Sequence, residues 1–415
     1  MKNINNTKKT YKKKKKKFRL FKKNKDKYTF EEVFAITIFS IVLGAFSVIS
    51  ILTIVFKGKN FIKIGRDLDK FTSAYQLILN NYYGDVDKNK LIDSAIEGMV
   101  NSVGDVYTSY SDIETSENFN TLVTGEYEGI GCLILNTEDG ITVYHIYEDS
   151  PADKAGLKEK DVILSVDNKD TKDMTLDDLS TYIRENKNKE VTLKVKREDK
   201  EEELVIKKST VEIPSVTSEI IEKNNKKIGY IGISLFSSVT DKQFHNKLER
   251  IEKDGIDSLI IDVRGNSGGY LSTVVNISSY LLPKGKTIYQ VESKGKKTKY
   301  KDETKEAREY PIAILIDNGS ASASEILASV IKESYKGYVV GVASYGKGTV
   351  QQVSTLKDGS MIKYTIENWL TPKGNWINEK GVTPTNEVKL NEEYYKDPKK
   401  ENDNQLEEAL NLLSK

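Results

Sequence analysis

Three serines alternate with alanines in one short stretch, Ser320-Ala321-Ser322-Ala323-Ser324, and Glu325 follows directly. Serines commonly cap the start of a helix, and a glutamate in the first turn fits such a cap. One serine would be enough for that purpose, however, and the small side chains also allow a substrate backbone to approach closely. A serine hydroxyl beside the free N–H groups of a helix N-terminus is suited to acyl transfer, because those groups stabilise an oxyanion.

A serine nucleophile needs a base, and the sequence offers one candidate. Lys347 lies between two glycines after an apolar run, which is unusual for a solvated lysine. Burial disfavours the ammonium form and can bring the pKa of a lysine toward about 7–8. His145 falls in an expected strand and His245 in an expected helix, and we interpret both as structural. A Ser–Lys pair is a known variant of triad chemistry, but these residues alone also fit an ordinary surface lysine.

The scarce residue types exclude several other chemistries. The chain of 415 residues has one cysteine, Cys132, which rules out an intrachain disulfide and a cysteine-rich zinc site. It has two histidines without an H-E-x-x-H motif, and it lacks both the G-x-G-x-x-G fingerprint and the P-loop motif. We therefore expect no metal ion, nucleotide or other cofactor.

The charges are divided unevenly along the chain. Residues 1–27 hold 14 Lys and Arg against the single acid Asp26, and the remaining 388 residues carry a net charge of −11. Val33–Phe56 follows as 24 residues without a charge, long enough to cross a bilayer. The bias of Lys and Arg predicts a plasma-membrane protein with its N-terminus inside and residues from Lys57 onward outside.

Two alternatives concern this N-terminal part. A cleaved signal peptide normally has a shorter apolar region and a cleavage site of small residues, whereas this stretch ends Thr-Ile-Val-Phe-Lys. The lysine run Lys12–Lys17 could bind nucleic acid, but its place beside the apolar stretch favours contact with anionic lipid. We therefore expect an uncleaved anchor and no nucleic-acid partner.

The expected domains are a basic cytoplasmic tail, a transmembrane helix, a helical segment, a PDZ domain, a serine peptidase core and a C-terminal helical tail. Their respective ranges are 1–32, 33–56, 57–124, 125–208, 209–392 and 393–415. Within the helical segment, apolar residues lie at helical spacing up to Val103 and form either core or an oligomer face. The sequence does not decide between these two.

Residues 125–208 resemble a PDZ domain. The likeness rests on Glu128-Gly129-Ile130-Gly131, Ser150-Pro151-Ala152-x-x-Ala155-Gly156-Leu157 and Asp161-Val162-Ile163, with Val191–Lys196 expected as an edge-type strand. PDZ domains add an extended peptide to a sheet and hold its terminal carboxylate on backbone N–H groups. The resemblance assigns that role to Gly129, Ile130 and Gly131. Lys160 stands where the family usually has glycine, so we expect a strained left-handed turn there.

Residues 210–392 have an α/β pattern. Ser258–Val263 is a continuous apolar run, typical of a strand covered on both faces. A glycine-rich turn and a helix, Tyr270–Leu282, follow this run. The pattern then repeats as the strand Ile312–Ile316, a helix over 322–334 and the strand Tyr338–Val342. These repeats predict parallel crossovers with a site at the carboxyl ends of the strands.

Most of the chain after residue 67 resembles the carboxyl-terminal processing peptidases, also called tail-specific proteases. The motifs that carry the likeness are Gly104-Asp105-Val106-Tyr107-Thr108, Ile228-Gly229-Tyr230-Ile231, Asp262-Val263-Arg264-Gly265-Asn266-Ser267-Gly268-Gly269, Gly319–Glu325, Tyr345–Gln351 and Thr371-Pro372-x-Gly374. Val106 and Ser267 replace frequent prolines of the family, and the usual acid after Pro384 is missing. None of these departures touches the serine or the lysine.

The resemblance implies a role for each matching residue. Ser322 would be the nucleophile, Lys347 the general base and Gln351 the residue that orients the lysine. The oxyanion hole would combine the backbone N–H of Ala323 with one from Gly268 or Gly269.

The predicted architecture is an α/β peptidase core of ClpP/crotonase-like type with an inserted PDZ domain, an N-terminal helical segment and one transmembrane helix. The predicted activity is that of a membrane-anchored serine endopeptidase that cleaves extracytoplasmic proteins or peptides with free C-termini. A homo-oligomer or a regulatory partner is compatible with the sequence. The alternatives are a catalytically inactive PDZ-bearing scaffold or receptor, and a crotonase-like acyl-CoA enzyme, which would have no use for a PDZ domain.

Overall fold

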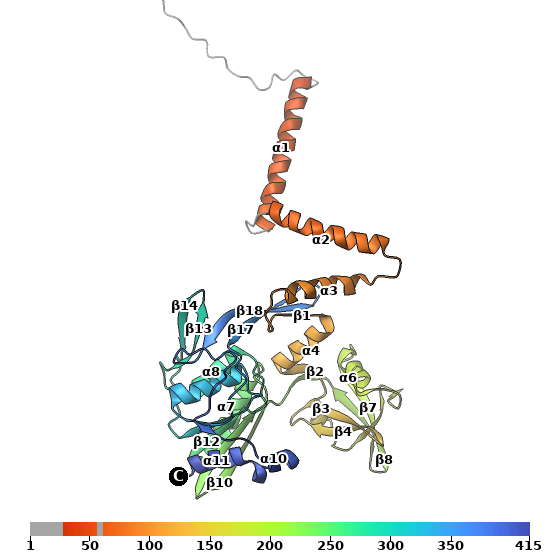
Figure 1. Cartoon of the computed structure of the whole chain (residues 1–415). Coiled ribbons are helices and arrows are strands. Elements are labelled where there is room, and N and C mark those ends of the chain that lie inside the picture. Colours follow the sequence, from red (N-terminus) through yellow and green to blue (C-terminus); the bar gives the residue numbers. More distant parts are fainter. Residues whose placement is uncertain (1–27, 56–60) are drawn as a thin grey trace, which may run out of the picture. The chain divides into compact units, whose positions relative to one another are not determined.

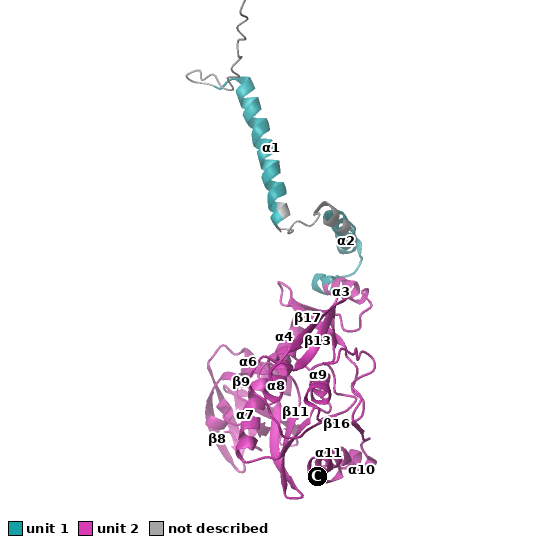
Figure 2. Cartoon of the chain, turned by 90° about the vertical axis from the view of Figure 1, so that its left-hand side faces the viewer, with its two compact units in different colours: residues 1–92 teal, residues 93–415 magenta. Residues whose placement is uncertain are grey.

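The computed structural model describes residues 28–55 and 61–415, in two compact units, 1–92 and 93–415 (Figure 2). The expected basic tail lies outside the described residues over positions 1–27, as does Phe56 at the end of the expected span. Each unit is described by itself below.

The first unit is helical. Helix α1 (Phe30–Val55) begins with a capping box in which Thr29 and Glu32 exchange hydrogen bonds between side chain and backbone. Its segment Phe30–Ile51 has a mean hydropathy of 2.4 and is not buried against the rest of the protein. The second helix of the unit is α2 (Phe61–Asn81).

Helix α3 (Lys88–Asn101) leads into the second unit. Val100 is buried, whereas Met99 and Val103 are exposed. The apolar face expected along this helix is thus only partly buried in the single chain. Strand β1 (Ser109–Ser111) and helix α4 (Ile113–Thr124) follow, and Asp112 caps α4 with its side chain.

The PDZ-like part of the second unit is an antiparallel sheet with its own apolar core (Figure 1). Its strands run in the order β3 (Cys132–Thr137), β4 (Gly140–Ile146), β5 (Val162–Val166), β7 (Glu190–Arg197) and β8 (Lys200–Lys207). Strand β6 (Lys169–Asp170) pairs with β5, and β2 (Glu126–Gly129) pairs with β9 (Ser209–Glu212). The helices are α5 (Pro151–Lys154), capped by Ser150, and α6 (Leu176–Glu185).

One expectation for this part is wrong. The strand over Val191–Lys196 is not an edge, because β7 pairs with β5 on one side and β8 on the other. Polar and apolar residues alternate less clearly in β8 than in β7, so β8 is difficult to recognise in the sequence. Lys160 does adopt a left-handed conformation, with φ of 72°.

The α/β part of the second unit, residues 216–387, is built on a second sheet. Its strands run in the order β10 (Val216–Lys223), β11 (Lys226–Ile233), β12 (Ser258–Asp262), β15 (Ile312–Ile316), β16 (Tyr338–Gly341) and β19 (Asn386–Glu387). All neighbours from β11 to β19 are parallel, and only β10 is antiparallel. The helices that connect these strands are α7 (Thr240–Lys253), α8 (Leu271–Leu281), α9 (Ala323–Ser329) and the π-helical segment Val330–Tyr335.

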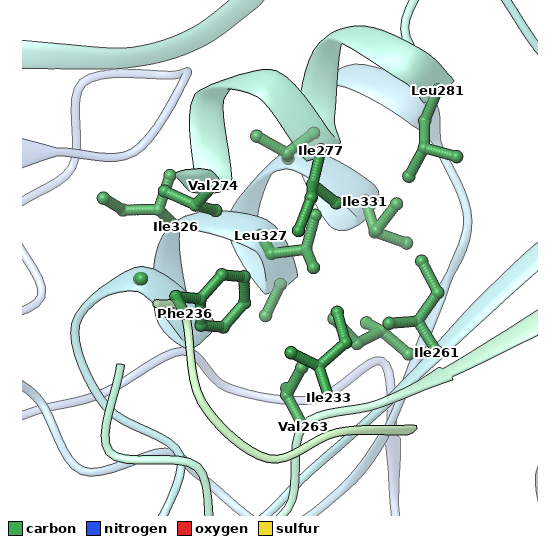
Figure 3. Close-up of a cluster of buried hydrophobic side chains, with 14 of the residues drawn as sticks. Ile233, Phe236, Ile261, Val263, Val274, Ile277, Leu281, Ile326, Leu327 and Ile331 are labelled. Carbon is green, nitrogen blue, oxygen red and sulfur yellow. The ribbon is translucent and has the colours of Figure 1, made fainter. Parts of the chain in front are cut away.

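The continuous apolar strands are explained by cores on both faces of this sheet. Leu259 and Ile261 of β12 join the core formed with α7, α8 and α9, part of which is drawn in Figure 3. Ile260 points to the other face, where α11 (Asn404–Leu413) packs through Leu406 and Leu410. Two short helices precede α11, namely α10 (Glu392–Lys396) and a 3-10 turn (Lys400–Asn402).

A third sheet is antiparallel and brings distant segments together. It has the order β1, β18 (Met361–Leu370), β13 (Thr287–Ser293) and β14 (Lys296–Lys301), and β17 (Thr349–Thr355) also pairs with β18. The β17–β18 hairpin begins directly after Lys347, and the pairing of β1 with β18 brings the residues around position 108 beside it.

Candidate active site

The three serines after β15 have different surroundings. Ser320 Oγ donates to the carbonyl of Val263 at 2.8 Å, and Ser324 Oγ donates to the carbonyl of Asn266 at 2.8 Å. Both side chains are fully buried. In the described part of the chain, the hydroxyl of Ser322 donates to no acceptor, and its oxygen only caps α9 at the N–H of Glu325. The outer two serines thus fasten this turn to the glycine-rich turn after β12, and the middle one is left available.

Ser322 is also held in an uncommon backbone conformation, with φ of 54° and ψ of −111°. A positive φ is costly for a residue with a side chain, and such strain concentrates at functional sites. Its neighbour on the other turn is Gly268, where an added Cβ would lie 2.8 Å from Ser322 Cβ and 3.1 Å from the backbone nitrogen of Ala323. Glycine at 268 therefore allows the two turns to meet.

Glu325 connects the serine turn to the lysine. Its Oε2 accepts from the backbone N–H of Ser322 at 2.8 Å and from that of Lys347 at 2.9 Å. Its Oε1 accepts from Ser344 Oγ at 2.6 Å and from the N–H of Gly346 at 2.7 Å. Because one oxygen accepts from both N–H groups, the backbone nitrogens of Ser322 and Lys347 are at most two hydrogen-bond lengths apart.

The backbone of Lys347 is fixed on its other side as well. Its carbonyl accepts from the indole N–H of the buried Trp369 at 2.7 Å, and Trp376 donates in the same way to the carbonyl of Gly348 at 3.1 Å. The side-chain nitrogen lies 5.1 Å from the ring centroid of Tyr107. Burial lowers the pKa of Lys347 and the charge of Lys363 lowers it further, while Glu325 and Asp105 act in the opposite direction.

No hydrogen bond joins Ser322 Oγ to Lys347 Nζ in the described residues. In a free enzyme such bonds are often long and tighten only when substrate binds. Gln351, expected to orient the lysine, donates its amide N–H to Thr349 Oγ1 at 2.8 Å and to Thr365 Oγ1 at 3.3 Å. Among the described residues, Gln351 thus makes no hydrogen bond with Lys347, the side chain it was expected to orient.

The backbone donors expected for an oxyanion hole are not equivalent. The N–H of Gly268 donates to Asn266 Oδ1 at 2.8 Å and is thus already engaged. Within the described residues, the N–H groups of Gly269 and Ala323 have no hydrogen-bond acceptor. These two are the free donors beside Ser322.

The glycine-rich turn is held rigidly by a buried ion network. Arg264 binds Asp262 at 2.6 Å and Asp403 at 2.7 Å, and all three side chains are nearly inaccessible to solvent. The backbone nitrogen of Gly265 donates to Asp317 Oδ1 at 2.8 Å, which connects the turn to the end of β15. Removing one member of such a network would leave an unpaired buried charge.

The segment before β1 adds residues that sequence reasoning did not place in the site. Asp105 Oδ2 accepts from Thr108 Oγ1 and from Thr365 Oγ1, each at 2.6 Å. Tyr107 contributes the ring over Lys347. The motif was recognised only as a family signature, and its distance from Lys347 in sequence gave no sign of contact.

The predicted carboxylate loop of the PDZ part lies between β2 and β3. Ile130 is buried, and its carbonyl accepts from Ala152 at 2.8 Å. Gly131 has φ of 83°, and an added Cβ would lie 2.4 Å from Ser150 Cβ. Gly129 is covered by the ring of Tyr127. Strand β3 pairs only with β4 among the described strands, so its other edge is open to an added strand.

The two histidines have other contacts. His145 Nδ1 lies 2.8 Å from Glu159 Oε1, and His245 stacks on Tyr280 at 4.6 Å. The rings of His245 and Tyr280 are tilted by 31° to each other. Neither histidine forms a hydrogen bond with Ser322 or Lys347 in the described part of the chain.

Comparison with known proteins identifies the family of the chain. The model of peptidase family S41 matches residues 227–388, and a model of the N-terminal domain of the activating protease CtpB matches 53–115. The carboxy-terminal processing protease CtpB of Bacillus subtilis (strain 168) is 40% identical over 326 residues, covering 78% of this chain and 68% of that protein. The chain belongs to peptidase family S41.

Other known proteins are also similar to this S41 peptidase. CtpA of the same organism is 36% identical over 324 residues, covering 78% of this chain and 69% of that protein. The solved structure of a photosystem II D1 C-terminal processing protease aligns with a TM-score of 0.46 at 23% identity, covering 86% of this chain and 96% of that one. A PDZ-domain model matches residues 142–197, beginning after the loop at Gly129–Gly131. The protein is a serine-type peptidase with a PDZ domain.

Proposed function

We propose that this S41 peptidase is a membrane-anchored serine endopeptidase that uses Ser322 and Lys347 as a catalytic dyad and selects extracytoplasmic substrates by their C-termini. The observation that carries the dyad is the carboxylate of Glu325, one oxygen of which holds the backbones of both residues. The free hydroxyl of Ser322 and the lowered pKa of Lys347 support it further.

The reaction proceeds in two halves. Neutral Lys347 takes the proton of Ser322 as Oγ attacks the scissile carbonyl carbon, and the N–H groups of Ala323 and Gly269 stabilise the oxyanion. The lysine ammonium then gives its proton to the leaving amine, which departs and leaves an acyl ester on Ser322. Water attacks this ester with Lys347 again as base, and the acid product and free serine are released. Gln351 acts on the lysine indirectly, because it donates to Thr365, whose hydroxyl in turn holds the anion Asp105.

Substrate selection is assigned to the PDZ part, residues 125–208, and catalysis to a peptidase core of ClpP/crotonase-like type over 209–392. The open edge of β3 accepts an extended C-terminus, and the loop Gly129–Gly131 receives its carboxylate. The partners of such a PDZ part are protein or peptide substrates with free C-termini. We expect no metal ion or nucleotide in the reaction.

Amidation of a substrate C-terminus tests this assignment. A peptide with a free carboxylate is expected to be cleaved at a higher kcat/KM than its amide, because the amide lacks the charge that the loop binds. In Gly131→Ala this ratio should fall toward one, since the added Cβ collides with Ser150. Gly140→Ala, a matched change at another positive-φ glycine where the added Cβ would meet Val162 at an ordinary 3.7 Å, should preserve the ratio. Equal cleavage of acid and amide by the wild type would refute the assignment.

The anchor is assigned to α1, with residues 1–32 in the cytoplasm and the body outside the plasma membrane. The apolar segment Phe30–Ile51 and the 14 Lys and Arg before it support this orientation. Protease added to intact cells is expected to remove the body and leave a small membrane-bound stub carrying the N-terminus. Complete protection of residues 57–415 in intact cells, with cleavage after lysis, would contradict it.

A further inference from the structure

The surroundings of Lys347 contain a charged residue of each sign that no catalytic role yet includes. Asp105 is held by hydrogen bonds from Thr108 Oγ1 and Thr365 Oγ1 and by the N–H of Tyr107 at 3.1 Å. Burial raises the pKa of Asp105, but these hydrogen bonds and the charge of Lys347 outweigh burial and lower it overall. Tyr107 donates its N–H to Asp105 and places its ring 5.1 Å from Lys347 Nζ, so Asp105 is an anion held on the residue that faces the base.

The opposite charge is Lys363 on β18. It lies two residues before Thr365, so both side chains leave the strand on the same face. Its register partners are Ser109 of β1 and Val353 of β17. The ammonium lies 5.9 Å from the ring centroid of Phe119, which restricts its position.

The remaining groups around Lys347 can be assigned as well. Glu325 on α9 faces it, but all four of its hydrogen bonds go to the Ser322, Ser344, Gly346 and Lys347 groups that shape the site. Tyr107 faces the ammonium with its ring, and Tyr345 and Glu379 act on the hydroxyl of Tyr107. Asp105 and Lys363 are thus the charges near Lys347 that neither build the serine turn nor belong to the dyad.

We propose that Asp105 and Lys363 are positioning residues of opposite sign that set how readily Lys347 gives up its proton. This inference rests on the proposed dyad, in which the neutral lysine is the active form. A nearby anion favours the ammonium and a nearby cation favours the free amine. The segment around Asp105, which lies more than 200 residues from the dyad in sequence, is by this account part of the catalytic machinery.

Two substitutions should move the pH dependence of kcat/KM in opposite directions. Asp105→Asn removes the anion but keeps the shape, and an amide can still bond to the threonine hydroxyls and to the N–H of Tyr107. Its acidic limb is expected to shift to lower pH, giving severalfold faster cleavage than wild type below the midpoint. Lys363→Gln should shift the limb to higher pH, with severalfold slower cleavage there. Both should approach the wild-type rate on the plateau at high pH.

Matched controls separate charge from structure. Lys357→Gln makes the same charge change at an exposed position of the same hairpin and should leave the limb in place. Lys363→Arg keeps the charge and should also keep the limb near its wild-type pH. Thermal unfolding of each variant shows whether it is folded, and the Arg variant keeps the test valid if Lys363→Gln does not fold.

The outcomes distinguish failure of the positioning inference from failure of the proposed dyad. If Asp105→Asn and Lys363→Gln lower the plateau without moving the limb, or move it in the same direction, the inference is overturned even though Ser322→Ala is inactive. If Ser322→Ala remains active, the dyad itself is wrong. Opposite shifts of the limb, with Lys357→Gln unchanged, support the inference.

Discussion

Replacing Ser322 by alanine is expected to reduce the cleavage of an unstructured peptide by about 10⁴-fold or more, because it removes the atom that forms the acyl bond. The fold should persist, since the Ser322 hydroxyl donates to no acceptor among the described residues and only caps the short helix α9. Peptide binding to the PDZ part should persist as well. The measurement is kcat/KM for one peptide together with the midpoint of thermal unfolding.

Ser324→Ala is the matched control, because it removes the same atom two residues away. Ser324 Oγ donates to the carbonyl of Asn266 in a fully buried setting, so its loss leaves that carbonyl without this donor. The N–H of Ala321 still donates to that carbonyl, so we expect a loss of about 0.5–1.5 kcal/mol in the free energy of unfolding, with cleavage retained by the folded protein. If Ser322→Ala kept substantial activity while Ser324→Ala or Ser320→Ala lost it, the wrong serine would have been assigned.

Lys347→Arg is expected to be nearly as inactive as Lys347→Ala, with losses of at least about 10²–10⁴-fold. A guanidinium stays protonated and cannot accept the serine proton, although it keeps the charge and much of the length of lysine. In the wild type, burial lowers the pKa of Lys347. Activity should therefore be lost as pH falls below that lowered pKa, where the amine is protonated, and rise to a plateau above it.

The double variant Ser322→Ala with Lys347→Ala should be little worse than either single variant, since the two residues act in the same step. Additive losses, or an arginine variant with near wild-type cleavage, would show that the lysine does not act as a base. The two single alanine variants, the double variant and the arginine variant are compared with the wild type at one pH on the plateau of the wild-type profile.

Much of the fold can be predicted from the sequence because burial determines where apolar residues stand. The run Leu259-Ile260-Ile261 is apolar throughout since its residues enter cores on both faces of the sheet. Ser150 and Pro151 predict the start of α5 from local capping chemistry alone. The edge assignment of β7 failed because pairing depends on β8, whose exposed lysines and glutamates give a weak strand pattern.

The site was only partly predictable. Ser322 and Lys347 stand in motifs, so a family resemblance identifies them. That Glu325 links both backbones could not be read from the sequence, where the same glutamate is a sufficient helix cap. Likewise, Asp105 reaches Thr365 only through the pairing of β1 with β18, a non-local contact that no spacing rule predicts.

The identity of the acylated residue is the most direct test of the central claim. A serine-reactive sulfonyl fluoride should modify the wild type at one site, and the peptide spanning residues 309–332, which trypsin releases between Arg308 and the bond after Lys332, contains all three serines of the turn. Fragmentation of that peptide by mass spectrometry is expected to place the adduct on Ser322, with labelling lost in Lys347→Ala. An adduct on Ser320, on Ser324 or outside this peptide, in protein whose inactivation follows the labelling, would contradict the account.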